Sequence, residues 1–306
     1  MTEAELASYP IDDPHSNVDW SQGGAVLAFV NEVAGGRRLL EALRERVDAG
    51  ADSVAVAAPQ NQPIVGQIVD RDEVRDAALS RVEVTQSVLA EFGIEASGAV
   101  MDPQPSLALD DAVRAFGPRE ILLSSLYEAR FGLLRRDLVE WAKDRFDVPV
   151  THIPVRVDDD AVRWDVTHTL VVGTQTIASP DLIARLKARA AERPHRYTMI
   201  CPRSGDLTRE EVVERLARTL AEMYRSDIDA TGQPMSPEPF AAIENAIEHY
   251  RIDDILISTL AGQQSKWLEQ GLIERVEAIT DKPVEHYEAG PSAGRSPQSA
   301  EAEVRA

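Results

Sequence analysis

Short runs of apolar residues alternate along this chain with longer stretches in which apolar residues recur every three or four positions. The short runs are rich in valine, isoleucine and leucine, as in strands that are buried on both faces. The longer stretches are typical of amphipathic helices, and Leu39, Leu40, Leu43 and Val47 share one face of such a helix. Regular alternation of the two patterns predicts βαβ units around a parallel sheet, and therefore an α/β protein.

The same pattern predicts ten strands in two sets of five. In the first set they span residues 26–31, 53–58, 95–100, 120–124 and 149–154, and in the second set 169–173, 197–201, 227–231, 254–258 and 283–287. Helices are expected in the gaps. Thr208 and Glu211, just before an apolar run, predict a capping box at the start of one of them.

The two sets are copies of one unit. The segment ILLSSL at 121–126 recurs as ILISTL at 255–260, and PVTH at 149–152 recurs as PVEH at 283–286, both at an offset of 134 residues. Near the start of each copy the offset is 143, so the first copy has nine extra residues between 60 and 93. A duplication in a chain of 306 residues predicts two domains.

These domains are expected at residues 23–157 and 167–288. Residues 158–166 contain three adjacent aspartates, which repel one another and favour an exposed linker. The segments 1–22 and 289–306 are rich in polar and small residues, so we expect them to be disordered.

Composition narrows the classes of partner. The net charge of −20 disfavours nucleic acid and anionic membrane surfaces. The single cysteine, Cys201, cannot form an intramolecular disulfide or a cysteine-based zinc site, and we interpret it as a small buried hydrophobe. No apolar run approaches the roughly 18–20 residues of a membrane span, and the acidic start does not resemble a signal peptide. We therefore expect a cytoplasmic protein.

Candidate chemistry follows the strands of the second copy. Ligands of doubly wound sheets bind outside the carboxyl ends of the strands. The segment GTQTIAS at 173–179 is followed by Pro180, which predicts an N-cap at Ser179 and a helix N-terminus open to an anion. The segment STLAGQQSK at 258–266 combines hydroxyls, a glycine and a lysine that could wrap a phosphate. Ordinary turn chemistry is the alternative explanation of both segments.

The carboxyl ends of the strands in the first copy are less suited to binding a phosphate. Glu32 and Glu128 would oppose a phosphate, and Tyr127 and Phe131 would crowd it. His152 and His286 occupy matching positions without nearby metal-ligand spacing, so we expect strand residues there and no metal site. No serine–histidine–aspartate set can be named.

The element order, the Ser97–Gly98 and Thr231–Gly232 turns followed by proline and a helix, and the ILISTL strand with its loop resemble the universal stress protein family. The resemblance covers residues 24–155 and 167–288. It implies two tandem doubly wound five-stranded sheets with strand order 3-2-1-4-5. It also implies that the two copies pair through their last strands as an intrachain pseudo-dimer, and it leaves a further homodimer open.

The nucleotide-binding members of that family carry an aspartate after strand one and a G-x-x-G-x9-G-[ST] loop after strand four. This sequence departs from both motifs: Asn31 and Thr174 stand near the aspartate position, and Arg136–Asp137 replace the closing pair in the first copy. The second copy keeps two loop glycines without the full spacing. The resemblance therefore implies ATP, with its magnesium, in the second domain only, and the candidate residues are Thr174, Ser258, Thr259, Gly262, Ser265, Lys266 and Gly271.

The sequence thus predicts a non-catalytic tandem universal-stress-type protein that binds ATP or another adenine nucleotide in its second domain. It would act in stress response through protein partners. The first alternative is a degenerate scaffold for protein–protein interaction that binds no nucleotide. The second is an ATP-using enzyme, which would need a positioned general base that the sequence does not reveal.

Overall fold

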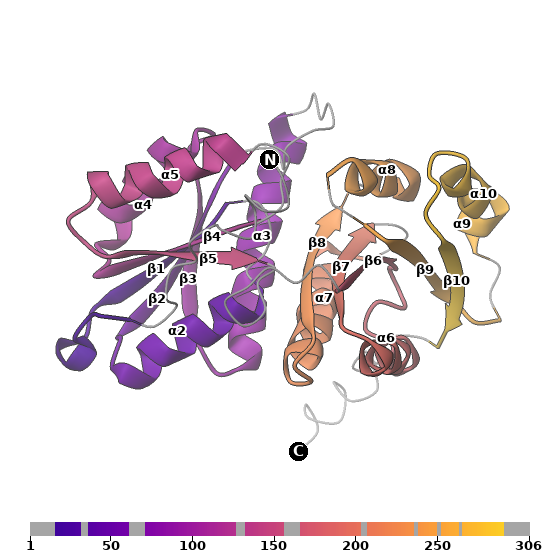
Figure 1. Cartoon of the computed structure of the whole chain (residues 1–306), viewed down its shortest axis with the longest axis horizontal. Helices are drawn as coiled ribbons and strands as arrows, with labels where there is room; N and C mark the ends of the chain where they lie inside the picture. Colours follow the sequence, from indigo (N-terminus) through magenta and orange to yellow (C-terminus); the bar gives the residue numbers. More distant parts are fainter. Residues whose placement is uncertain are drawn as a thin grey trace, which may run out of the picture.

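The computed structural model describes residues 16–31, 36–60, 71–126, 132–155, 166–202, 207–235, 238–249, 252–262 and 265–290. They form two α/β halves that lie side by side (Figure 1). The first half contains η1 (Trp20–Gln22), β1 (Ala25–Val30), α2 (Arg37–Ala49), β2 (Ser53–Pro59), α3 (Arg71–Glu91), β3 (Ala96–Met101), α4 (Pro105–Phe116), β4 (Glu120–Leu126), α5 (Gly132–Arg145) and β5 (Val150–Val155).

The second half repeats this order. It contains β6 (Thr167–Val172), α6 (Pro180–Glu192), β7 (His195–Pro202), α7 (Arg209–Tyr224), β8 (Asp229–Met235), α8 (Pro239–His249), β9 (Asp254–Leu260), α9 (Lys266–Glu269), α10 (Leu272–Glu277) and β10 (Val284–Ala289). All ten predicted strands are confirmed within a few residues at each end. The capping box predicted at Thr208 and Glu211 begins α7.

Each half has one parallel five-stranded sheet. The strand order is β3-β2-β1-β4-β5 in the first and β8-β7-β6-β9-β10 in the second, so both follow the predicted order 3-2-1-4-5. In each sheet the order reverses beside the first strand, between β1 and β4 and between β6 and β9. The fold is therefore the tandem, doubly wound α/β fold that the sequence predicted.

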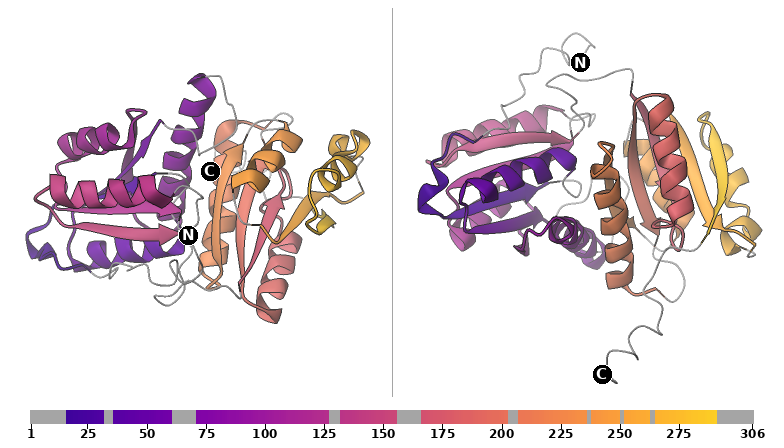
Figure 2. Two further views of the ribbon diagram at one scale, coloured as in Figure 1. Left: turned by 45° about the horizontal axis from the view of Figure 1, so that its top comes forward. Right: turned by 90° about the horizontal axis from the view of Figure 1, so that it is seen from below.

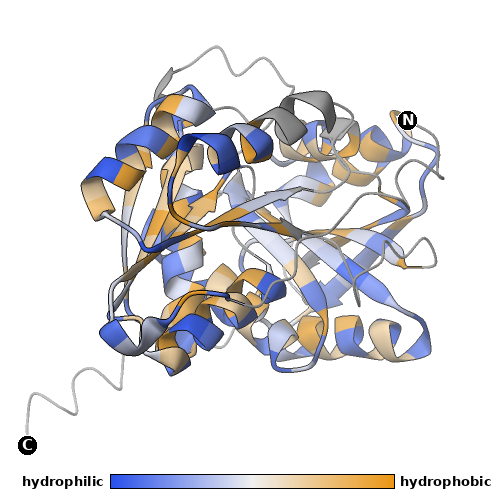
Figure 3. Ribbon diagram, turned by 60° about the vertical axis from the view of Figure 1, so that its left-hand side comes forward, coloured by the Kyte–Doolittle hydropathy of each residue, from blue (hydrophilic) through white to orange (hydrophobic). Residues whose placement is uncertain are grey.

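Helices cover both faces of each sheet. Helices α4 and α5 pack their apolar side chains on one face of the first sheet, and α8 and α10 do so in the second. Helices α2, α3, α6 and α7 pack on the other faces and share one continuous hydrophobic core. The helices show alternating bands of hydrophobic and hydrophilic residues, as amphipathic helices do (Figure 3).

The two halves meet through α3 and α7, which run side by side between the sheets (Figure 2). Val82, Val88 and Leu89 of α3 belong to the same buried core as Leu216 and Leu220 of α7. Helix α3 also packs on β8.

Charged residues flank this apolar seam. Arg209 of α7 forms ion pairs with Asp76 and Glu83 of α3. Arg225 pairs with Glu91 at 3.2 Å and lies over the Phe92 ring, 4.9 Å from its centroid.

This contact corrects the pairing that the resemblance implied. Strands β5 and β10 are edge strands of two separate sheets, and they lie far from each other (Figure 1). Packing of α3 on α7 and β8 joins the copies instead of pairing between their last strands. Apolar side chains of α3 and α7 share one buried core, and this burial holds the two copies together.

The first half begins earlier than predicted. Trp20 is 2% exposed, and its indole Nε1 donates to the Ser16 hydroxyl, which donates to Glu120. Gly50 must be glycine beside it, because its φ is +119° and a Cβ there would lie 2.6 Å from the Trp20 carbonyl oxygen. Residues 16–22 are thus ordered, and the expected disorder of this part of 1–22 is wrong because the tryptophan is buried.

The second half ends slightly later than predicted. Ala289 is the last residue of β10 and is buried, and Gly290 is also described. The predicted linker lies outside the described residues except for Val166, as do residues 61–70 in the region of the nine-residue insertion. Among the described residues, no helix is both long and apolar enough to cross a membrane.

An ion pair at the amino ends of β4 and β9 is repeated in the two halves. The Arg46 guanidinium binds Glu120 with an Nη2–Oε1 distance of 2.6 Å, and both side chains are at most 1% exposed. The same offsets relate this pair to Arg189 and Asp254, which also form an ion pair. Both pairs lie at the edge opposite the strand ends where the candidate residues were predicted, so we assign them to stability.

Replacing Arg46 with methionine should lower the free energy of unfolding by about 3–5 kcal/mol, because Glu120 would remain buried without its cation. Urea unfolding at pH 7 measures this change. Arg114→Met is the control, since Arg114 is 67% exposed and should change stability by less than about 0.5 kcal/mol. Equal stabilities for the two variants would contradict a structural role for the buried pair.

Candidate functional site

The carboxyl ends of β6 and β9 bring the predicted residues of the second half together. These strands are parallel neighbours, so the turn after β6 and the loop after β9 start at the same edge. The Thr176 hydroxyl of the turn donates to the Ser258 carbonyl at 3.1 Å. A Cβ on Gly173 would lie 3.6 Å from the Ser258 Cβ. The structure therefore places Thr174, Ser258 and Thr259 at one edge, as predicted.

Most hydroxyls at this edge have internal partners. Thr174 Oγ1 donates to the Pro202 carbonyl at 3.0 Å, and Thr259 Oγ1 lies 2.8 Å from His286 Nε2. Both threonines are buried. These bonds connect the turn after β6 to β7, and the end of β9 to β10. The two threonines therefore stabilise this edge of the sheet.

Two serines at the same edge differ from the threonines. Ser258 and Ser179 are 1% and 0% exposed, and neither Oγ has a hydrogen-bond partner among the described residues. A buried hydroxyl without a partner costs roughly 1–3 kcal/mol. Ser124, which corresponds to Ser258 in the first half, is buried in the same way. These atoms are the ones that a bound group would satisfy.

The N-terminus of α6 is built as predicted, with Ser179 as N-cap and Pro180 at the first position. Its positive end already has an acidic neighbour, because Asp181 lies in the first turn. The Asp181 carboxylate accepts a hydrogen bond from Gly290 N at 3.1 Å. A ligand anion would therefore compete with Asp181 at this helix end.

The remaining candidates lie farther along the loop. Gly262 is exposed with φ +68°, and none of the described residues lies within 4 Å of a Cβ built on it. Ser265 is the N-cap of the four-residue α9, and the exposed Lys266 is its first residue. Gly271 begins α10 with φ +65°. These residues surround Gln263 and Gln264, which lie outside the described residues.

Sequence reasoning missed a repeated hydroxyl–histidine pair. Ser125 Oγ lies 2.8 Å from His152 Nε2 in the first half, as Thr259 does from His286 in the second. Both members of each pair are related by the same offset of 134, which was the available signal. The histidines are strand residues, as predicted. Glu32, Tyr127, Glu128 and Phe131, which predicted a closed first edge, lie outside the described residues.

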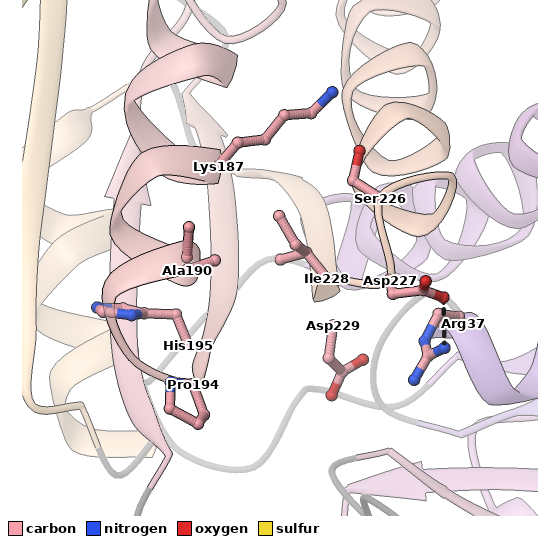
Figure 4. A pocket seen from close by; sticks show the side chains of 10 residues that line it. Arg37, Lys187, Ala190, Pro194, His195, Ser226, Asp227, Ile228 and Asp229 are labelled. Atoms are coloured by element: carbon pink, nitrogen blue, oxygen red, sulfur yellow. Dashed lines mark hydrogen bonds and ion pairs between the residues drawn. The ribbon is translucent and has the colours of Figure 1, made fainter.

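A hollow of about 430 Å³ lies at the opposite edge, where the amino ends of β7 and β8 meet the first half (Figure 4). Its polar and charged lining includes Arg37, Lys187, Ser226, Asp227 and Asp229. No sequence motif predicted this hollow, because its lining residues come from separate segments of the chain.

Comparison with known proteins adds little at the level of sequence. No protein-family model and no curated protein matches the chain. A solved structure that matches is that of a universal stress protein from Archaeoglobus fulgidus DSM 4304, with 18% identity and a TM-score of 0.34. The match covers 87% of this chain and 97% of that chain. The strand order of the two sheets, rather than this distant likeness, defines the fold.

Cys201 should resist thiol reagents in the folded protein. It is fully buried, and burial raises the pKa of its thiol to about 12, so very little thiolate exists at pH 8. We expect labelling by a disulfide reagent such as DTNB at pH 8 only after denaturation in guanidinium. Rapid stoichiometric labelling of the native protein would contradict this placement.

Proposed function

We propose that the chain is a non-catalytic tandem universal-stress-type protein whose second half binds a small phosphate-bearing ligand, with ATP and its magnesium as the first candidate. The observation that carries the proposal is the Ser258 hydroxyl. It is buried near the carboxyl end of β9, beside the β6–β9 reversal of strand order, and no hydrogen-bond partner is found for it in the part of the chain that the structure describes. Ligands of open α/β sheets bind at such reversals.

The surroundings of Ser258 suit a phosphate. The loop that follows it contains the exposed Gly262 and the exposed cation Lys266. Gly173, on the turn after β6, places no side chain beside Ser258, where a Cβ would lie 3.6 Å from the Ser258 Cβ. Backbone N–H groups in glycine-containing loops and a lysine ammonium are common phosphate donors.

The groups at this edge support binding more than catalysis. Hydroxyls, glycines and one lysine can hold a ligand, whereas proton transfer needs a titratable group placed against the reacting atom. The ring of His286, on the edge strand β10, is hydrogen-bonded to the Thr259 hydroxyl. We therefore propose a regulatory role for the ligand. Its binding to the second half would alter how the protein docks to protein partners in the cytoplasm during stress.

A degenerate scaffold is the second candidate. It is favoured by the internal partners of Thr174, Thr176 and Thr259 and by Asp181 at the α6 N-terminus. In this case neither half would bind a nucleotide, and the acidic surface would contact other proteins. A ligand experiment separates the two candidates.

A thermal melt of nucleotide-stripped protein, with and without millimolar ATP and magnesium, tests the proposal. A ligand at 100 times its dissociation constant stabilises the folded state by about 2.7 kcal/mol, which corresponds to a shift of several degrees. Ser258→Ala should reduce this shift because it removes the unpartnered hydroxyl. Gly262→Asp should abolish it by adding a carboxylate to the loop.

Ser124→Ala is the matched control, since it removes the equivalent buried hydroxyl from the first half. This variant should keep the full ATP shift. No shift in the wild-type protein would favour the scaffold. Equal losses in Ser258→Ala and Ser124→Ala would show that the second-half site is wrong.

A further inference from the structure

The hollow between the halves is a second candidate site, independent of the carboxyl edge. Arg37, at the start of α2, lines it from the first half. From the second half come the last turn of α6, the start of β7 and the α7–β8 turn, with Lys187, Pro194 and residues 226–229. A ligand in the hollow would therefore touch both halves.

Opposite ends of helix dipoles face each other across this space. The N-terminal end of α2, which is the positive end, lies on the Arg37 side, and its N-cap Gly36 supplies no side-chain cap. The C-terminal ends of α6 and α7, which are negative, border the other side through Ala190, Ala191 and Ser226. The Asp229 carboxylate lies on that side as well.

The Arg37 guanidinium is held on one side by two carboxylates. Its Nη1 donates to Glu41 and Asp227, both at 3.2 Å, and its Nε is buried without a hydrogen-bond partner among the described residues. The guanidinium extends toward Asp229 in Figure 4. Because Nε is buried, a ligand carboxylate in the hollow would accept a charge-assisted hydrogen bond from Nη2.

Asp227, which pairs with Arg37, has an unfavourable backbone conformation. Its φ is +56°, and Ile228 N and Asp227 N donate to the Met223 and Tyr224 carbonyls. These two bonds form a Schellman turn, in which glycine is the usual left-handed residue. An aspartate here makes the turn less stable than a glycine would. It also forms the ion pair with Arg37 of the other half.

The other walls add little charge. Ala190, Pro194 and Ile228 are apolar, and the Lys187 ammonium pairs with Glu222 and points away from Asp229 (Figure 4). Burial lowers the pKa of His195, so its ring is neutral at pH 7. The hollow therefore has a positive side, a negative side and an apolar floor.

We propose that this hollow binds a small zwitterion of the amino-acid type, with its carboxylate toward Arg37 and its ammonium toward Asp229 and the C-terminal ends of α6 and α7. Asp227 is a positioning residue that orients Arg37. A purely anionic ligand would face Asp227 and Asp229, and a purely cationic one would face Arg37. Only a ligand with both charges meets a complementary group on each side.

Isothermal titration and thermal melts with glycine, 4-aminobutanoate and 6-aminohexanoate test this site at constant ionic strength. Butanoate and butylammonium serve as probes that each carry one of the two charges. We expect at least one zwitterion to bind and to raise the melting temperature, while the single-charge probes have no such effect. Equal effects of zwitterions and single-charge probes, or no effect of any zwitterion, would overturn the proposal.

Variants locate the binding. Arg37→Gln and Asp229→Asn should each weaken binding at least about tenfold, a loss of about 1.4 kcal/mol. The exposed controls Arg114→Gln and Glu214→Gln should leave it unchanged. Similar affinities for the site variants and their controls would place any binding elsewhere and contradict the proposal.

The Asp227→Gly variant distinguishes a loss of Arg37 positioning from a loss of folding. Glycine suits the left-handed position, so the melting temperature without ligand should rise while the affinity for the zwitterion falls. A weaker affinity in a more stable protein cannot result from poor folding. Unchanged affinity in this variant would refute the positioning role of Asp227.

Discussion

The packing of α3 against α7 is the interaction on which the rest of this structure depends. It buries apolar side chains from both halves in one core, so the duplicated chain forms one body. It also brings the start of α2 to the α7–β8 turn, where Arg37 and Asp227 pair across the halves. The edge strands β5 and β10 are left apart as a consequence.

Each half has two chemically different ends, because all strands of a parallel sheet point the same way. The amino ends of β4 and β9 carry the buried ion pairs Arg46–Glu120 and Arg189–Asp254, which stabilise the repeat. The carboxyl ends carry hydroxyls, most of which are used internally. Among the described residues, Ser258 and Ser179 are buried at the second-half edge without a hydrogen-bond partner, and Ser258 lies at the reversal of strand order.

The fold could be predicted from the sequence because the strands leave local apolar patterns, and the duplication provides every strand twice. The convergence of Thr174, Ser258 and Thr259 was predictable for the same reason, since parallel strands end at one edge. The partners of their hydroxyls could not be predicted, because Pro202 and His286 lie on other strands and the bonds depend on side-chain geometry. The burial of Trp20 was missed because its partner Ser16 lies in a segment with a disordered composition.

The contact between the halves was predicted wrongly because the sequence pattern assigns helices to these segments without saying which helices of the two copies meet. The hollow was missed because Arg37 and Asp227 are 190 positions apart. Hydrogen exchange measured by mass spectrometry tests the central claim of one shared core most directly. The account predicts that peptides of α3 and α7 exchange together, at the rate of global unfolding, as denaturant is added. Exchange of one half through a separate, earlier opening while the other half stays protected would contradict it.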